Sequence, residues 1–292
     1  MSARFFNRRL RYVLYKFWAL LGLVRWYNIL LMTVALYLSA IYFFNPEESI
    51  RATLLDYRLH LSIIALILFI ASGFIINAFY DVEKDMINRP RATFFDRHIS
   101  RTFSFNCYFL FNAIAAILSL FVDWQVLVIN SLFAIVLWLY SHKLRKVKYL
   151  GEIGAAMLTV APFFSLATYY QEVTLKMFEF IALIFVYIIG REIVKKLIGI
   201  RGDIIIGEQS LPIVMGEKRA SGFIVFLALV SLAQIAFFIR FLLHGYIDYV
   251  FYSMAVILGL IIYQEGVRKD HTTVNRLYKV LIILCILSIP FI

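Results

Sequence analysis

Long apolar runs alternate with short polar, mostly basic segments along almost the whole chain. Most of the runs are about 17 to 25 residues long, the length that a helix needs to cross the hydrocarbon core of a membrane. We therefore expect about nine membrane-spanning helices, the last of them short. The predicted spans are residues 23–44, 60–80, 103–121, 124–141, 150–170, 177–198, 221–243, 246–264 and 277–292.

The composition agrees with a membrane protein. Of the 292 residues, 63% are hydrophobic and 17% are aromatic, and the mean hydropathy is +0.84. No linker rich in Pro, Gly or Ser interrupts the apolar runs, so we expect residues 1–292 to form a single all-α, polytopic helical bundle. Cys107 and Cys285 both lie in apolar runs and indicate neither a disulfide framework nor a zinc site.

Positive charge is concentrated in alternate loops. If the N-terminus is cytoplasmic, the opposite side of the membrane holds only Arg51, Arg58, Lys176 and Arg240. Such asymmetry is what the positive-inside rule predicts, so we expect an integral protein of a bacterial inner membrane whose basic loops face the cytoplasm. The net charge of +11 is spread among these loops and not gathered on one soluble face, so we expect no nucleic-acid partner.

Three polar segments lie on the expected cytoplasmic side. Residues 1–16 are basic with interleaved aromatics, which is typical of a retained interfacial helix and not of a cleaved signal peptide. Residues 81–102 and 191–220 begin with charges that continue a helix and contain Pro90 and Pro212, where a helix is expected to break. We expect these two segments to be cytoplasmic loops that cap the bundle.

Asn77, Asp81 and Asp85 recur every fourth residue, directly after an apolar run. On a helix, steps of four residues place side chains on one face, about 6 Å apart along the axis. Ionisable groups at such depth are costly and suggest a functional site, and clustered carboxylates are hard ligands that suit Mg²⁺. The simpler interpretation is a solvated helix end, but the one-face spacing and the depth of Asn77 argue against it.

The run from Asn77 to Pro90 resembles the first aspartate-rich motif of the UbiA superfamily of intramembrane prenyltransferases. The resemblance implies about nine helices and transfer of a prenyl group from a prenyl diphosphate to a lipophilic acceptor, with Mg²⁺ bridging the diphosphate to two aspartate-rich motifs. The similarity covers nearly the whole chain, through Arg25-Trp-Tyr-Asn28, Tyr140-Ser-His-Lys143-Leu-Arg145, Arg191-Glu-Ile-Val-Lys195 and the segment from Gly202 to Pro212.

The resemblance also implies roles for individual residues. Asp81 and Asp85 hold Mg²⁺, with Asn77 as a ligand or orienting group. Arg25 contacts the diphosphate, although it is also placed to snorkel at the interface. The full set expected to bind the diphosphate is Arg25, Asn28, Arg89, Tyr140, Lys143, Arg145, Arg191 and Lys195. A Lys is more usual in the family at the position of Arg145.

The second motif departs from the family pattern. The family usually has acidic residues at the positions of Lys196 and Gly199 and at Asp203, and only Asp203 is acidic here. One interpretation is that Lys196 does the work of a second metal ion, because fixed cations also neutralise a diphosphate; Lys196 and Asp203 are then catalytic. A second interpretation is that the protein binds a lipid phosphate at this site without turnover. A third is that the basic residues are only positive-inside anchors.

The sequence is therefore consistent with two classes of function. The first is Mg²⁺-dependent prenyl transfer within the membrane, to an acceptor of the archaeal glycerol-phosphate lipid or quinone-precursor class. The second is a non-catalytic UbiA-like protein that binds a lipid phosphate or partner helices. A transporter fits less well, because its charges usually lie near the midplane of the bilayer and here they lie at the expected cytoplasmic ends.

Overall fold

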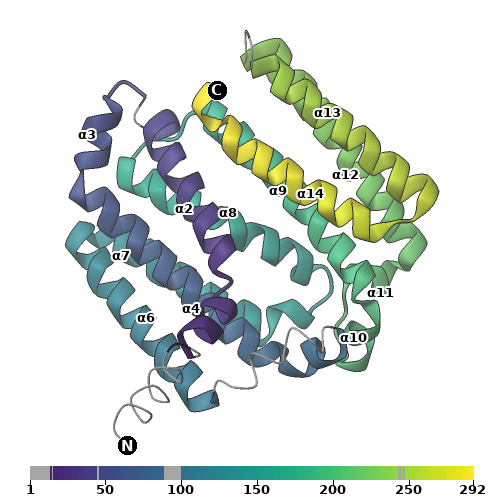
Figure 1. Ribbon diagram of the computed structural model, residues 1–292, viewed down its shortest axis with the longest axis horizontal. Helices are drawn as coiled ribbons and strands as arrows, with labels where there is room; N and C mark the ends of the chain where they lie inside the picture. The colour runs from purple at the N-terminus through teal and green to yellow at the C-terminus, as the bar shows by residue number, and fades with distance from the viewer. Residues whose placement is uncertain (1–13, 15, 45, 89–99, 243–244, 246) are drawn as a thin grey trace, which may run out of the picture.

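The structure is a computed structural model that describes all residues except 1–13, 15, 45, 89–99, 243–244 and 246. Its described part is built from helices, packed as a bundle in which α9 and α14 separate α4, α6 and α7 from α12 and α13 (Figure 1). The α-helices are α2 (Trp26–Ser39), α3 (Ile50–Leu55), α4 (Tyr57–Asn88), α6 (Arg101–Val122), α7 (Trp124–His142), α8 (Leu150–Tyr170), α9 (Leu175–Ile198), α10 (Ile200–Ile205), α11 (Leu211–Met215), α12 (Glu217–Phe237), α13 (Ile247–Tyr263) and α14 (His271–Ser288). Short π or 3₁₀ segments are η1 (Ala40–Phe44), η2 (Leu144–Lys146), η3 (Phe238–Leu242), η4 (Gln264–Arg268) and η5 (Ile289–Phe291).

The predicted all-α membrane bundle is confirmed. Among the described residues, 8 helical segments are long and apolar enough to cross a membrane. The predicted span over residues 177–198 is α9, which has a suitable length but carries several charges and is not one of these segments. The segments are Trp26–Phe44, Tyr57–Val82, Arg101–Val122, Trp124–His142, Leu150–Tyr170, Glu217–Phe241, Ile247–Arg268 and His271–Phe291.

The helix α4 is longer than a membrane span. Its 32 residues extend over about 48 Å at 1.5 Å per residue, against a hydrocarbon core of about 30 Å. The apolar part of α4 ends at Val82. The helix therefore carries Asp81 and Asp85 to the end of the bilayer core and beyond it.

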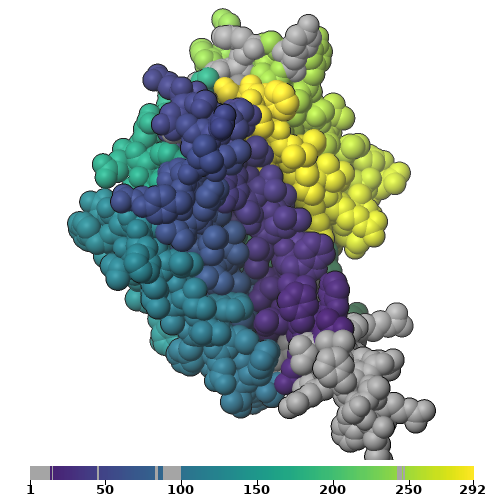
Figure 2. All heavy atoms as spheres, turned by 60° about the vertical axis from the view of Figure 1, so that its left-hand side comes forward, coloured from purple at the N-terminus to yellow at the C-terminus, as the bar shows by residue number. Residues whose placement is uncertain are grey.

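The helix α9 is the centre of the packing, in contact with α8, α12 and α14. Its side chains Phe180, Leu183 and Tyr187 are fully buried. At Gly190, a Cβ atom would lie 2.5 Å from the hydroxyl oxygen of Tyr278 on α14, so the two helices touch through that glycine. The helix α2 lies between α14 and α4 and contacts both, as Figure 2 shows.

The expected cap segment over residues 191–220 is mostly helical, and it begins with charges that continue α9, as expected. It comprises the end of α9, then α10, α11 and the start of α12. The helix is interrupted at residues 206–210, and Pro212 follows in the first turn of α11, where its missing N–H is not needed; its side chain is buried. The charged residues after Asp81 do continue α4 as far as Asn88.

Two other expectations fall outside the described residues. These are most of the basic interfacial helix over residues 1–16 and the central part of the expected loop over residues 81–102, including Pro90. The described end of that loop is the N-cap of α6, where Ser100 accepts a hydrogen bond from the backbone N–H of Phe103.

Replacing Gly190 by alanine should destabilise the bundle, because the new methyl group meets the buried ring of Tyr278. We expect Gly190→Ala to cost about 1–3 kcal/mol, the usual range for overpacking a core, visible as a lower midpoint of thermal unfolding in detergent. Gly259→Ala is the matched control, because a Cβ at that helical glycine meets no atom within 4 Å. An equal loss in both variants would show that the α9–α14 contact is not tight.

Candidate functional site

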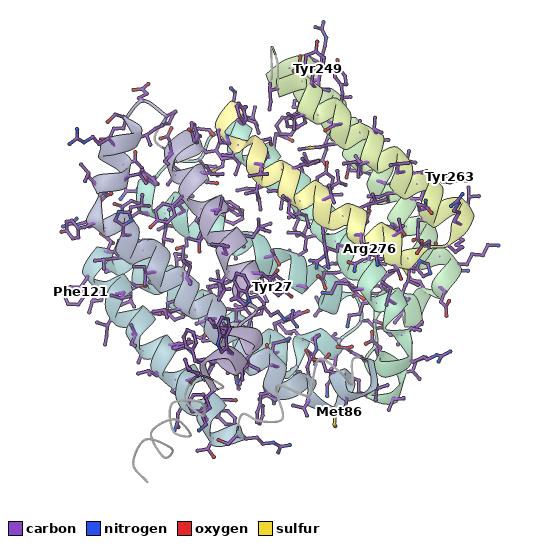
Figure 3. All side chains as sticks on the ribbon, viewed as in Figure 1. Tyr27, Met86, Phe121, Tyr249, Tyr263 and Arg276 are labelled. Atoms are coloured by element: carbon purple, nitrogen blue, oxygen red, sulfur yellow. The ribbon has the colours of Figure 1, made fainter. Side chains whose placement is uncertain are left out.

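Asn77 and Asp81 lie together at the end of α4, as their spacing predicts. The amide nitrogen of Asn77 donates a hydrogen bond of 2.8 Å to Oδ2 of Asp81. Asp81 is buried, with 8% of its surface exposed. Asp85 follows one turn later and is half-buried. In Figure 3, Met86 marks these last turns of α4.

Arg145 binds this acidic end of α4 from the short helix η2. Its Nη1 lies 2.5 Å from Oδ1 of Asp81 and donates a hydrogen bond of 3.1 Å to Oδ1 of Asn77. Its Nε lies 2.9 Å from Oε1 of Glu208. Burial disfavours the guanidinium charge, but Asp81 and Glu208 outweigh burial and raise the pKa of Arg145, so the side chain stays charged. A planar guanidinium reaches three partners at once, which a lysine in this position does not.

The backbone around Arg145 is fixed by close packing with the start of α8. A Cβ atom on Gly151 would lie 2.8 Å from the carbonyl oxygen of Arg145, so no larger residue fits there without a shift. The hydroxyl of Tyr140 donates a hydrogen bond of 2.9 Å to the carbonyl oxygen of Gly151. Tyr140, expected as a diphosphate ligand, thus has a structural contact beside the site.

Lys196 lies in a second group of charges at the end of α9. Its Nζ is 2.8 Å from Oε2 of Glu208 and 3.5 Å from Oδ2 of Asp203. Lys196 is 9% exposed, Glu208 is 2% exposed and Asp203 is fully buried. A lysine that only anchored the helix at lipid head groups would be exposed, so this burial argues against the anchor interpretation.

Glu208 joins the two groups of charges. It contacts Arg145 through one oxygen and Lys196 through the other. The described contacts thereby connect Lys196 to Asp81 through Glu208 and Arg145, and they do not pair Lys196 with Asp81 directly. We call this set of six residues the charge network: Asn77, Asp81, Arg145, Lys196, Asp203 and Glu208.

Further cations on α9 and at the start of α2 flank the charge network. Lys195 forms an ion pair of 2.7 Å with Glu192, and Arg191 is half-buried with no hydrogen-bond partner for its Nε among the described residues. Arg25 precedes α2 in the left-handed conformation, its guanidinium 5.4 Å from the ring centre of Phe74. Arg25 also lies within electrostatic range of Lys195.

The other expected diphosphate ligands are placed less directly. Asn28 is half-buried in the first turn of α2, beside Tyr27, which Figure 3 labels. Lys143 is exposed. Arg89 lies outside the described residues.

Sequence reasoning missed two buried carboxylates, Glu152 and Glu208. Oε1 of Glu152 accepts a hydrogen bond of 2.7 Å from the backbone N–H of Leu211, which fastens α11 to α8. Glu152 is the only charged residue in its apolar run over residues 150–170, and a charge inside a span is a signal that could have identified it. Glu208 lies in a turn between two short helices, where no periodic pattern marks it.

The donors at the end of α4 suit Mg²⁺ chemically. Mg²⁺ is usually held by one or two carboxylates together with water and substrate phosphates, and Asp81, Asp85 and the Asn77 amide oxygen supply such oxygens. Nowhere in the described ranges do three or more Asp, Glu, His or Cys side chains form a group that could hold a metal by themselves.

Residues 49–284 match the family model described as the UbiA prenyltransferase family. The chain belongs to this family. The family match confirms the resemblance to UbiA-type prenyltransferases that the sequence motifs carry.

Curated relatives are archaeal proteins named digeranylgeranylglyceryl phosphate synthase. The protein of Pyrococcus furiosus is 32% identical over 50% of this chain and 52% of its own length. That of Methanobrevibacter smithii is 25% identical over 80% of this chain and 85% of its own length. The chain thus spans about half the length of the first relative and most of the second.

Solved structures share the fold. One, described as giving insights into digeranylgeranylglyceryl phosphate synthase in membranes, has a TM-score of 0.69 and 23% identity, and covers 94% of this chain and 97% of its own. A UbiA homolog from Archaeoglobus fulgidus bound to GPP and Mg²⁺ has a TM-score of 0.66 and 16% identity, with coverage of 94% and 100%. At these identities the likeness establishes the fold.

Exchanging Arg145 for lysine should destabilise the protein although the charge is kept. A lysine ammonium does not span Asp81, Asn77 and Glu208, so one buried carboxylate loses its partner, and breaking a buried pair typically costs about 3–5 kcal/mol. Thermal unfolding in detergent measures the loss. Lys148→Gln, at an exposed position of the same loop, should unfold like the parent; an unchanged Arg145→Lys variant would show that the three contacts do not act together.

Proposed function

We propose that this protein transfers a prenyl group from a prenyl diphosphate to a lipid acceptor within the membrane. The observation that carries the proposal is the charge network itself, which joins the aspartate motif of α4 to the cations of η2 and α9 at one end of a membrane bundle. Membership of the UbiA prenyltransferase family supports it.

The diphosphate would bind among the cations around the network. Arg145 is 5% exposed, and its Nη2 is buried without a hydrogen-bond partner in the described part of the chain. Such a donor fits a phosphate oxygen, because an unsatisfied buried N–H is costly. Arg191, Lys195 and Arg25 add positive charge beside it, in keeping with the roles expected from the sequence.

A divalent metal ion has a place in this proposal. When bound by Asp81 and Asp85, with Asn77 beside them, Mg²⁺ supplies positive charge that neutralises the diphosphate. The Archaeoglobus fulgidus homolog described with Mg²⁺ supports this cofactor. Asn77 and Arg145 both contact Asp81, so their contacts would have to loosen as the ion binds.

In the proposed reaction, the bond between the first prenyl carbon and the diphosphate oxygen breaks, and the electron pair leaves with the diphosphate. Arg145 and its neighbouring cations stabilise that leaving group. The allylic cation is attacked by an acceptor hydroxyl, which forms a new C–O bond and releases its proton to the departing diphosphate. Burial of the site excludes water, which would otherwise capture the cation.

For the acceptor we favour a glycerol-phosphate lipid, because the curated relatives are named digeranylgeranylglyceryl phosphate synthase. A quinone precursor is the other class expected from the sequence. We place the site on the cytoplasmic side because the basic residues gather at that end. The bacterial inner membrane stays a prediction, and the named relatives are archaeal.

The proposal predicts prenyl transfer by the purified protein. Incubation with labelled geranylgeranyl diphosphate, Mg²⁺ and either geranylgeranylglyceryl phosphate or an aromatic quinone precursor should yield product with the glycerol-phosphate acceptor. Asp81→Asn should lower the rate by about 10²-fold or more, the scale of removing one group that stabilises developing charge. Glu217→Gln removes an exposed acid at the start of α12 and should react like the parent.

The two acceptors separate the substrate classes. Product with the quinone precursor alone would replace the glycerol-phosphate assignment. Tight binding of the diphosphate without product from either acceptor would favour the non-catalytic alternative, in which the protein binds a lipid phosphate or partner helices.

A further inference from the structure

The carboxylate of Glu208 is shared between two cations, one on each oxygen. Oε1 lies 2.9 Å from Nε of Arg145, and Oε2 lies 2.8 Å from Nζ of Lys196. The two cations come from different elements, η2 and α9. Because the two oxygens of a carboxylate are rigidly connected, Glu208 fixes the position of each cation relative to the other.

The backbone that carries Glu208 is itself fastened on several sides. The N–H of Glu208 donates to the carbonyl oxygen of Asp203 at 2.9 Å, and the next N–H, of Gln209, donates to that of Lys146 at 3.4 Å. Two residues later, Glu152 accepts the N–H of Leu211. The turn is thereby attached to α10, η2 and α8, so the carboxylate is presented from a fixed support.

The contact with Glu208 leaves one part of the Arg145 side chain without a partner. Nε faces Glu208 in an ion pair that is not aligned as a hydrogen bond, and Nη1 faces Asp81 and Asn77. Nη2 is buried and has no hydrogen-bond partner among the described residues. A guanidinium fixed by a hydrogen bond at Nη1 and by ion pairs with Asp81 and Glu208 presents Nη2 in a defined direction, as recognition of a phosphate oxygen requires.

We propose that Glu208 is a positioning residue for the diphosphate, an assignment that rests on the proposed prenyl transfer. It holds Arg145 and Lys196 as a fixed pair of cations and leaves Nη2 of Arg145 for a phosphate oxygen. It also accounts for the departure from the family pattern at Lys196, because that lysine lies between Glu208 and Asp203 and its ammonium supplies a resident cation there.

Positioning and plain electrostatics predict opposite results for a neutral substitution. Removing a negative charge near an anion should strengthen binding of the anion if charge alone matters. If Glu208 positions Arg145, Glu208→Gln should instead weaken binding of geranylgeranyl diphosphate by roughly tenfold or more, the scale of one lost charge-assisted hydrogen bond. The control is Glu217→Gln, which removes one exposed negative charge at the start of α12, outside the charge network, and should bind like the parent.

The experiment measures the dissociation constant of geranylgeranyl diphosphate by titration calorimetry in detergent, with Mg²⁺ and separately with EDTA. Because EDTA removes Mg²⁺, the titration in EDTA measures the binding that the basic side chains of the protein provide by themselves. Glu208→Asp is the second variant: it keeps the charge, but its shorter side chain does not hold both cations, so it should also bind more weakly. Thermal unfolding identifies variants that are not folded.

The outcomes separate this inference from the function on which it rests. Failure of the parent protein to bind geranylgeranyl diphosphate in either buffer would overturn both. If the parent binds and transfers, but folded Glu208→Gln or Glu208→Asp binds as tightly as the parent or more tightly, the role of Glu208 is refuted and prenyl transfer stands. Weaker binding by both Glu208 variants, with Glu217→Gln unimpaired, supports the assignment.

Discussion

The buried ion pair between Arg145 and Asp81 is the interaction on which the rest of the site depends. A guanidinium taken out of water is stable only if carboxylates surround it, and Asp81 and Glu208 do so from two different parts of the chain. The pair therefore ties the end of α4 to η2 and to the turn after α10. The remaining charges of the network follow from this arrangement, because Glu208 also pairs with Lys196, and Lys196 pairs with Asp203.

The apolar part of the bundle makes such a polar site possible. The helix α9 is held by α8, α12 and α14, with α14 touching its backbone at Gly190. The next residue is Arg191, where the charged end of α9 begins. A helix fixed so tightly just before this charged end presents the end's charges in defined positions, and precise placement of cations is what stabilising a leaving diphosphate requires.

The fold and one half of the site could be predicted from the sequence, for reasons that differ by residue. Span lengths and the four-residue spacing of Asn77 and Asp81 are local properties, and the structure bears out the bundle and the pairing of these two side chains. In the segment over residues 191–220, the charges that continue α9 and the break near Pro212 are local signals, whereas the short helices α10 and α11 depend on tertiary packing. The role of Glu208 could not be predicted, because its partner Arg145 is distant in sequence. The pairing of Lys196 with Glu208 and Asp203 likewise depends on tertiary contacts that no sequence pattern encodes.

The most direct test of the account is an experimental structure of the protein with Mg²⁺ and a slowly reacting prenyl thiolodiphosphate. The account predicts a phosphate oxygen within hydrogen-bond distance of Nη2 of Arg145, Mg²⁺ against Asp81 and Asp85, and Lys196 still paired with Glu208. A metal ion between Asp203 and Glu208, with Lys196 displaced from them, would contradict it.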